Sequence, residues 1–231
     1  MSQVKQRQGS RRRSKSTKAG LSREARLLLL IGIPIILVAI VLIALYRGTQ
    51  PVSQVTDESR LIRPDSPSLG AADAPVTIVE FLDPECESCR AAFPAVKQIL
   101  EEYSGRVQLV VRYFPLHTNS VLAATATEAA GQQGKYWEMQ ELLFTRQTEW
   151  GEQRTPQTDR FINYAQELGL DIDQFTAALD DSAVFEKIER DRQDGIALGV
   201  DGTPTFFING RLVEPLSYDT IISMIEDGLA Q

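Results

Sequence analysis

The stretch VEFLDPECESC, residues 79–89, joins an apolar run directly to a pair of cysteines. Residues 75–82 (PVTIVEFL) are rich in β-branched and aromatic side chains and are bounded by turn formers, which predicts a central β-strand. A helix is predicted from Cys89 to Tyr103, with Pro94 as a kink. Residues 107–114 (VQLVVRYF) predict a second strand. This order predicts an α/β unit with a right-handed parallel crossover.

Downstream of the second strand, the pattern is helical over a long stretch. Helices are predicted at 119–130, 135–144, 158–168, 172–179 and 182–198. The pattern then returns to a strand at 205–208, a turn at Asn209-Gly210, a strand at 211–213 and a helix at 217–229. A helical insertion at about 118–199 therefore interrupts an α/β domain.

The chain has two cysteines, Cys86 and Cys89, and their spacing is that of a redox pair. A structural zinc site is an alternative, but it needs four ligands and the chain has one histidine. A permanent disulfide is another alternative, although so short a loop constrains the unfolded chain little. The spacing favours thiol-disulfide chemistry, for which a thiolate is required.

Cys86 is expected at the N-terminus of a helix, where free N–H groups and the macrodipole favour an anion. We therefore expect Cys86 to be the exposed nucleophile and Cys89 the buried resolving cysteine. The carboxylates of Glu85 and Glu87 are expected to raise the pKa of the thiol and make the pair less oxidising, unless both point into solvent.

The N-terminal part of the chain has a different composition. Residues 1–48 carry ten Lys or Arg and one Glu, a net of +9, whereas the whole chain has a net charge of -7, which leaves -16 for residues 49–231. An acidic main domain argues against nucleic-acid binding. Residues 27–46 contain no charged side chain and, at about 1.5 Å per residue, span roughly 30 Å as a helix.

These features predict four segments: a basic cytoplasmic tail (1–26), a transmembrane helix (27–46), a Pro- and Ser-rich tether (47–69) and a folded domain (70–231). The positive-inside rule puts the N-terminus in the cytoplasm and the folded domain outside it. A cleaved signal peptide is the rival interpretation, but its apolar region is usually shorter. We expect a single-pass protein of the cell membrane with an extracytoplasmic catalytic domain.

From about Gly70 to Leu229 the chain resembles the DsbA-like branch of the thioredoxin superfamily. The resemblance lies in VEFLDPECESC, in YFPLH at 113–117 with GQQGKYWEMQELLF at 131–144, and in GVDGTPTFFINGRLV. It implies a thioredoxin-like α/β fold with a helical insertion.

The resemblance also implies roles for individual residues. Pro204 corresponds to a cis proline beside the redox pair, and Thr203 and Thr205 correspond to backbone that pairs with the substrate peptide. Glu80 matches a partly buried acid that moves protons to and from the resolving cysteine; Asp83 is a weaker candidate for this work. His117 is expected to be a structural or surface residue.

The predicted function is a thiol-disulfide oxidoreductase, most simply a dithiol oxidase of exported proteins that acts through Cys86 and Cys89. The resemblance implies reoxidation by a quinone-linked membrane partner, and no dissociable cofactor is needed. A membrane-tethered reductase or isomerase is an alternative. Alternatives of other classes are a folding chaperone and an extracytoplasmic copper metallochaperone that uses Cys86, Cys89 and His117.

Overall fold

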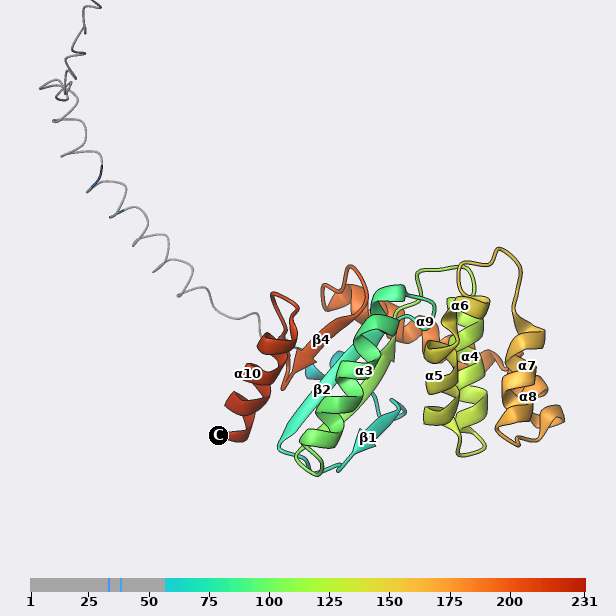
Figure 1. Ribbon diagram of the computed structural model, residues 1–231, viewed down its shortest axis with the longest axis horizontal. Helices are drawn as coiled ribbons and strands as arrows, with labels where there is room; N and C mark the ends of the chain where they lie inside the picture. The colour runs from blue at the N-terminus through green and yellow to red at the C-terminus, as the bar shows by residue number, and fades with distance from the viewer. Residues whose placement is uncertain (1–32, 34–37, 39–56) are drawn as a thin grey trace, which may run out of the picture. The chain divides into compact units, whose positions relative to one another are not determined.

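The computed structural model describes residues 57–231, together with Ile33 and Val38 (Figure 1). In chain order the elements are α2 (Glu58–Leu61), β1 (Ser68–Gly70), β2 (Val76–Leu82), α3 (Glu87–Glu102), β3 (Val107–Tyr113), α4 (Ser120–Gly131), α5 (Tyr136–Thr145), α6 (Gln147–Trp150), α7 (Thr158–Glu167), α8 (Ile172–Ala178), α9 (Ser182–Ala197), β4 (Thr205–Ile208), β5 (Arg211–Leu212) and α10 (Tyr218–Leu229).

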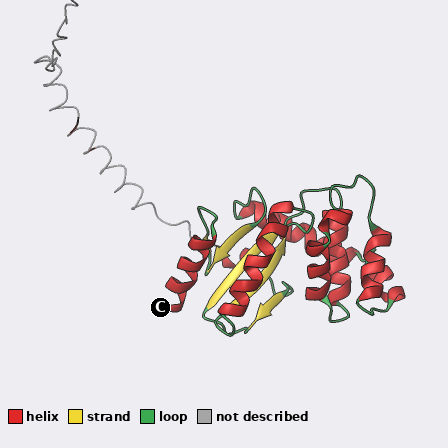
Figure 2. Cartoon of the chain, viewed as in Figure 1, coloured by secondary structure: helices red, strands yellow, loops and turns green. Residues whose placement is uncertain are grey.

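A five-stranded sheet with the order β1-β3-β2-β4-β5 forms the centre of the domain (Figure 2). β2 and β3 are parallel and are connected through α3, as the sequence predicts. The other neighbouring pairs are antiparallel. The fold is thioredoxin-like, with a mixed sheet and helices.

All residues of β2 except Thr77 are buried, because both faces of the strand are covered. Ile78 and Leu82 belong to the apolar cluster that also contains residues of α3 and α10. Val79 and Phe81 belong to the cluster on the opposite face. Because side chains alternate along a strand, Glu80 lies on the same face as Ile78 and Leu82. The continuous apolar run in the sequence therefore marks a central strand, with one carboxyl inside.

α3 begins directly after Cys86, which is its N-cap residue. The helix continues across Pro94 to Glu102 without an interruption. Its buried side chains, Val96 and Ile99, pack in the same cluster as β2. Packing of this apolar side fixes the N-terminus of the helix at the carboxyl end of the central strand.

Six helices, α4 to α9, lie between β3 and β4 in the chain. Figure 1 shows α4, α5, α7 and α8 gathered beside the sheet, at the end of the domain away from α10. Their own apolar cluster packs small side chains of α4 against large ones from the other helices: Ala123, Ala126, Ala129, Ala130, Met139, Leu143, Trp150, Phe161 and Phe175. Alanines on α4 allow the neighbouring helices to approach closely.

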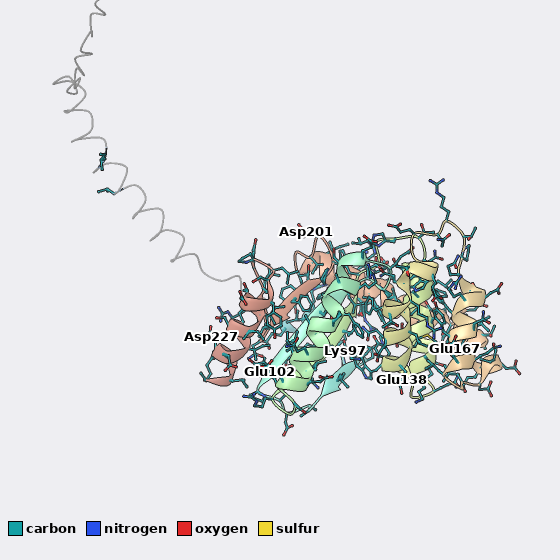
Figure 3. All side chains as sticks on the ribbon, in the orientation of Figure 1. Lys97, Glu102, Glu138, Glu167, Asp201 and Asp227 are labelled. Atoms are coloured by element: carbon teal, nitrogen blue, oxygen red, sulfur yellow. The ribbon has the colours of Figure 1, made fainter. Side chains whose placement is uncertain are left out.

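The surface of the described domain carries many exposed carboxylates. Those labelled in Figure 3 lie on α3, α5, α7, α10 and the loop before β4: Glu102, Glu138, Glu167, Asp201 and Asp227. This distribution agrees with the negative net charge of the chain beyond residue 48.

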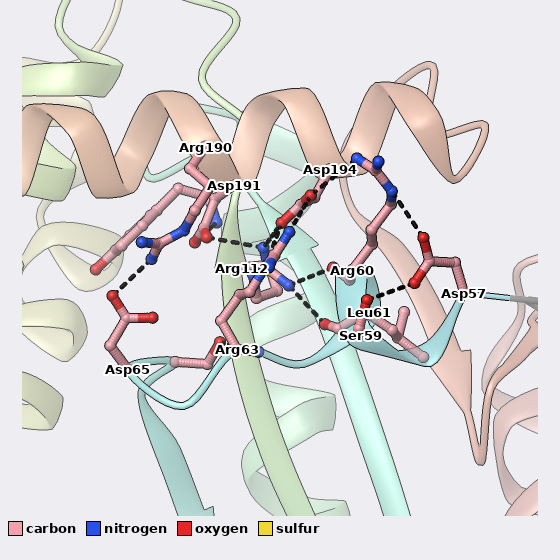
Figure 4. Close-up of polar contacts among 12 residues, drawn as sticks. Asp57, Ser59, Arg60, Leu61, Arg63, Asp65, Arg112, Arg190, Asp191 and Asp194 are labelled. Atoms are coloured by element: carbon pink, nitrogen blue, oxygen red, sulfur yellow. Dashed lines mark hydrogen bonds and ion pairs between the residues drawn. The ribbon is translucent and has the colours of Figure 1, made fainter.

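The predicted tether is wrong for its last part, because residues 57–69 include α2 and the start of β1. The reason is Arg112, a fully buried side chain in β3 that donates to the carbonyl oxygens of Arg60 (2.6 Å) and Leu61 (2.7 Å) (Figure 4). Arg112 also donates to Asp194 at 2.8 Å, and Arg63 binds the same carboxylate at 2.7 and 2.8 Å. These contacts hold the segment on the sheet.

The tail (1–26), the predicted membrane span (27–46) and the first part of the tether lie outside the described residues, apart from Ile33 and Val38. Within the part of the chain that the structure describes, no helix is long and apolar enough to cross a bilayer. Three short elements were not predicted from the sequence: α2, β1 and α6.

Candidate active site

The two cysteines meet at the start of α3. Cys86 caps the helix and Cys89 lies one turn further in. Both are free thiols in this structure, with 8% of Cys86 and 1% of Cys89 exposed. Cys89 is therefore the more deeply buried of the two, as expected, but Cys86 is buried as well and not exposed as the sequence analysis expects.

The surroundings of Cys86 stabilise its thiolate. A hydrogen bond from the Cys89 thiol lowers the pKa of Cys86 to about 5, against burial, which raises it. The side chain of Thr203 and hydrogen bonds from the backbone N–H groups of Cys89 and Ser88 lower this pKa further. These N–H groups belong to the first turn of α3, where they lack a partner within the helix. Cys86 is therefore ionised at neutral pH.

The pKa of Cys89 is shifted in the opposite direction, upward. Its hydrogen bond to Cys86 raises the pKa of Cys89 far above the ordinary value, and burial and the charge of Glu80 raise it as well. Glu80 is itself 4% exposed, and burial raises the pKa of its carboxyl group to about 8. The carboxyl is thus mostly protonated at pH 7, and it lies on the face of β2 toward α3.

The loop before β4 lies against Cys86. The peptide bond between Thr203 and Pro204 is cis, as the resemblance implies. The Cys86 sulfur lies 3.4 Å from the Thr203 carbonyl oxygen. The buried Thr203 hydroxyl makes no hydrogen bond to another described residue by geometric criteria, which leaves it free to donate to the thiolate. The Thr205 hydroxyl instead donates to the Gly202 carbonyl at 2.8 Å.

Glu85 and Glu87 do not set the pKa of Cys86: hydrogen bonds lower this pKa, and neither carboxylate is among the causes of its shift. Glu87 is exposed. Glu85 is 3% exposed, and its carboxylate accepts hydrogen bonds from the N–H groups of Asn119 (2.6 Å) and Glu152 (2.9 Å). The carboxylate of Glu85 therefore points into the helical insertion, where it binds the backbone of two loops. The pKa of Cys86 is set mainly by the hydrogen bonds to its sulfur.

Asp83 and His117 form a pair beside the cysteines, with 2.6 Å between Asp83 Oδ2 and His117 Nδ1. Asp83 is fully buried, and its carboxylate also accepts from the N–H groups of Glu85 and Leu116, each at 2.8 Å. Because these contacts occupy both oxygens, Asp83 orders the loop rather than serving Cys89. His117 is exposed, as expected of a surface residue, and its contact with Asp83 connects it to the turn of Cys86.

Gln147 is a site residue that the sequence analysis does not select. Its amide nitrogen donates to the carbonyl oxygens of Pro84 (2.9 Å) and Cys86 (3.0 Å), and its amide oxygen accepts from Arg90 at 3.1 Å. Gln147 comes from α6, so the helical insertion directly supports the cysteine turn. A glutamine in a polar stretch carries no sequence signal of such a contact.

The site offers few metal ligands. Among the residues that the structure describes, no group of three or more His, Cys, Asp or Glu side chains is arranged to hold a metal ion. His117 already contacts Asp83 through Nδ1. The geometry therefore lends no support to the copper alternative.

A CxxC pair at a helix N-terminus, beside a cis proline in a thioredoxin-like fold, defines the class of thiol-disulfide exchange proteins. A family model described as thioredoxin matches residues 63–227. The chain belongs to this family.

Two solved structures of oxidoreductases resemble the domain. A thioredoxin-like oxidoreductase from Silicibacter pomeroyi DSS-3 is 28% identical with a TM-score of 0.65, over 77% of this chain and 99% of that one. BdbD from Bacillus subtilis, in the oxidised state, is 26% identical with a TM-score of 0.66, over 78% of this chain and 98% of that one. Proteins named DsbA share the fold at lower identity. The structural neighbours are thus DsbA-like oxidoreductases.

Curated relatives match over a shorter share of their length. A protein named Na(+)/H(+) antiporter NhaA from Herminiimonas arsenicoxydans is 38% identical over 159 residues, which is 68% of this chain and 24% of the relative. The chain spans about a quarter of that relative, so the antiporter activity in its name is not carried over to this chain.

Proposed function

We propose that this protein is a dithiol oxidase that introduces disulfides into exported proteins through Cys86 and Cys89. The observation that carries the proposal is the stabilised thiolate of Cys86, whose pKa is lowered to about 5. A stabilised thiolate favours the reduced form of the pair, and a pair with a stabilised reduced form is a strong oxidant. Membership of the thioredoxin family and the oxidoreductase neighbours support thiol-disulfide exchange.

The proposed cycle begins with the oxidised pair. A substrate thiolate attacks the Cys86 sulfur, the Cys86–Cys89 bond breaks, and Cys89 leaves and takes up a proton. A second substrate thiolate then attacks the substrate sulfur of the mixed disulfide and displaces the Cys86 thiolate. The substrate gains one disulfide and loses two electrons, which the pair retains. The low pKa of Cys86 makes it a good leaving group in the second step.

Glu80 is proposed to exchange the proton of Cys89. Its carboxyl group lies on the face of β2 toward α3, its charge acts on Cys89, and its pKa of about 8 suits proton exchange near neutral pH. Glu80 would supply a proton when Cys89 leaves and accept one when the pair is reoxidised.

Pro204 and its neighbours are proposed to receive the substrate peptide. Thr203 lies against Cys86, so a chain in mixed disulfide with Cys86 would lie close to the backbone of residues 203–205. Pairing with this backbone would position the substrate sulfurs for the second attack.

The cellular setting is part of the proposal. The uncharged segment 27–46 and the basic tail before it support a single-pass anchor with the catalytic domain outside the cytoplasm. A quinone-linked membrane oxidase is the proposed reoxidant, and exported protein thiols are the proposed substrates.

The decisive experiment is the redox equilibrium of the full-length chain with glutathione buffers at pH 7. A reduction potential near about -120 mV supports an oxidase, whereas a value near about -270 mV would contradict it and favour a reductase.

A second readout uses a reduced peptide with two thiols. We expect Cys89→Ser to accumulate the mixed disulfide on Cys86, and Cys86→Ser to form none.

A further inference from the structure

The loop of His117 and the turn of Cys86 are joined through one buried residue, Asp83. Its carboxylate lies 2.6 Å from His117 Nδ1, and its backbone carbonyl accepts a hydrogen bond from the Cys86 N–H at 3.1 Å. Contacts with the N–H groups of Glu85 and Leu116 fix the carboxylate. Asp83 therefore contacts the imidazole through its carboxylate and the backbone of Cys86 through its carbonyl oxygen.

The His117 loop is well ordered, yet its ring remains accessible. The His117 N–H donates to the Ser120 hydroxyl at 3.0 Å, which anchors the loop at the start of α4. The side chain of His117 is 46% exposed, whereas Asp83 is fully buried. A buried carboxylate that holds one ring nitrogen orients the imidazole. The exposed ring can exchange a proton with solvent or with an approaching thiol.

Three negative groups act on the His117 ring. Burial lowers the pKa of His117, but the hydrogen bond and charge of Asp83, and the charges of Cys86 and Glu85, raise it, and the net direction is upward. The charge of Cys86 disappears when the pair forms a disulfide.

The redox reaction releases a proton that an imidazole beside the cysteines could accept. A substrate dithiol that becomes a disulfide releases two electrons and two protons. Cys89, whose pKa is raised, takes one proton. Cys86 takes none near pH 7 because its pKa is about 5. The second proton needs another acceptor near the sulfur.

We propose that His117, oriented by Asp83, is this acceptor: its imidazole gains a proton when the pair is reduced and loses it when the pair is oxidised. In full, substrate dithiol, enzyme disulfide and neutral His117 give substrate disulfide, Cys86 thiolate, Cys89 thiol and protonated His117. The same balance holds in reverse for a reductase, so the proposal does not depend on the direction of electron flow. It rests on the proposed redox cycle of the pair.

The first test uses the wild-type, full-length chain. His117 is the only histidine in the sequence, so one labelled imidazole signal in an NMR titration reports its pKa without assignment by mutation. We expect the pKa of His117 to be higher in the reduced than in the oxidised protein by about one unit, the lower end of the range for opposite charges in close approach. Equal values in the two states would overturn the proposal.

Cys86→Ser separates this inference from the proposed function. If the reduced wild type gives a higher pKa of His117 than Cys86→Ser does, the thiolate charge acts on the ring whether or not the pair turns over. If the pair does not form a disulfide, the proposed redox function fails. The comparison with Cys86→Ser still decides whether imidazole and thiolate are coupled.

The second test measures the reciprocal effect. Coupling between two sites is equal in both directions, so His117→Asn should raise the pKa of Cys86 by the same amount, as followed by thiolate absorbance. Asparagine keeps a donor for Asp83 and removes only the titratable ring. Thr118→Asn, at the exposed neighbouring position, is the matched control and should leave this pKa unchanged. An unchanged pKa of Cys86 in His117→Asn would contradict the coupling between the imidazole and the thiolate.

Discussion

The side-chain amide of Gln147 donates a hydrogen bond to the carbonyl oxygen of Cys86, 3.0 Å away. Gln147 belongs to α6 and Cys86 to the turn after β2, so the bond connects the helical insertion to the redox pair. Glu85 makes a second connection through the N–H groups of Asn119 and Glu152. The insertion thus supports the geometry of the nucleophile as well as extending the domain.

Replacing Gln147 by alanine should destabilise the protein. The buried Pro84 carbonyl would lose its donor from the side chain, and an unsatisfied buried group costs about 1–3 kcal/mol. Urea unfolding of the full chain measures the loss. Gln153→Ala is the matched control because Gln153 is exposed and its side chain donates only to the Gly151 carbonyl at 3.4 Å, while its backbone contact with Asn119 is kept. Equal losses in both variants would contradict the supporting role of Gln147.

Glu80 should make stability depend on pH. Its pKa rises from 4.5 to about 8 on folding, so between these values the folded state binds more protons than the unfolded state. Stability should therefore fall as pH rises from about 5 to 8, by up to about 1.4 kcal/mol per pH unit. Urea unfolding at both pH values should show a smaller fall for Glu80→Gln. The exposed Glu102→Gln should behave as wild type, and an unchanged slope in Glu80→Gln would count against this assignment.

Thr203→Val should raise the pKa of Cys86 by about one unit, because the hydroxyl that stabilises the thiolate is lost without a change in shape. The rate of alkylation as a function of pH gives this pKa directly. Thr205→Val is the matched control, since its hydroxyl donates to the Gly202 carbonyl instead. If the two valine variants give the same pKa of Cys86, the Thr203 hydroxyl does not stabilise the thiolate.

Arg112→Met should release the segment 57–67 from the sheet. The variant removes a buried cation and leaves Asp191 without its partner, a type of change that costs about 3–5 kcal/mol. We expect a lower free energy of unfolding and faster trypsin cleavage after Arg60. Arg190→Met, which breaks an exposed pair with Asp65, should cost under about 1 kcal/mol. Unchanged cleavage in Arg112→Met would show that the segment is held by other contacts.

Much of the fold could be predicted because local patterns agree with the tertiary structure. The strand at 76–82 is predicted one residue longer at its start, and the helices of the insertion other than α6 are predicted to within a residue or two of their bounds. The sequence does not reveal α2 and β1, which depend on contacts with distant residues. Leu61 is buried in an apolar cluster with Val79 and Phe81, and Arg112, 51 positions later, binds its carbonyl.

The sequence by itself determined that Cys86 and Cys89 are one turn apart at a helix start, and that Glu80 lies in an apolar strand. Both follow from local spacing, since strand and helix periods fix which side chains share a turn or a face. Only the tertiary structure decided the net charge environment of Cys86. Thr203, Asp83 with His117, and Gln147 converge on it from three separate segments, and the packing of those segments directs Glu85 away from the sulfur.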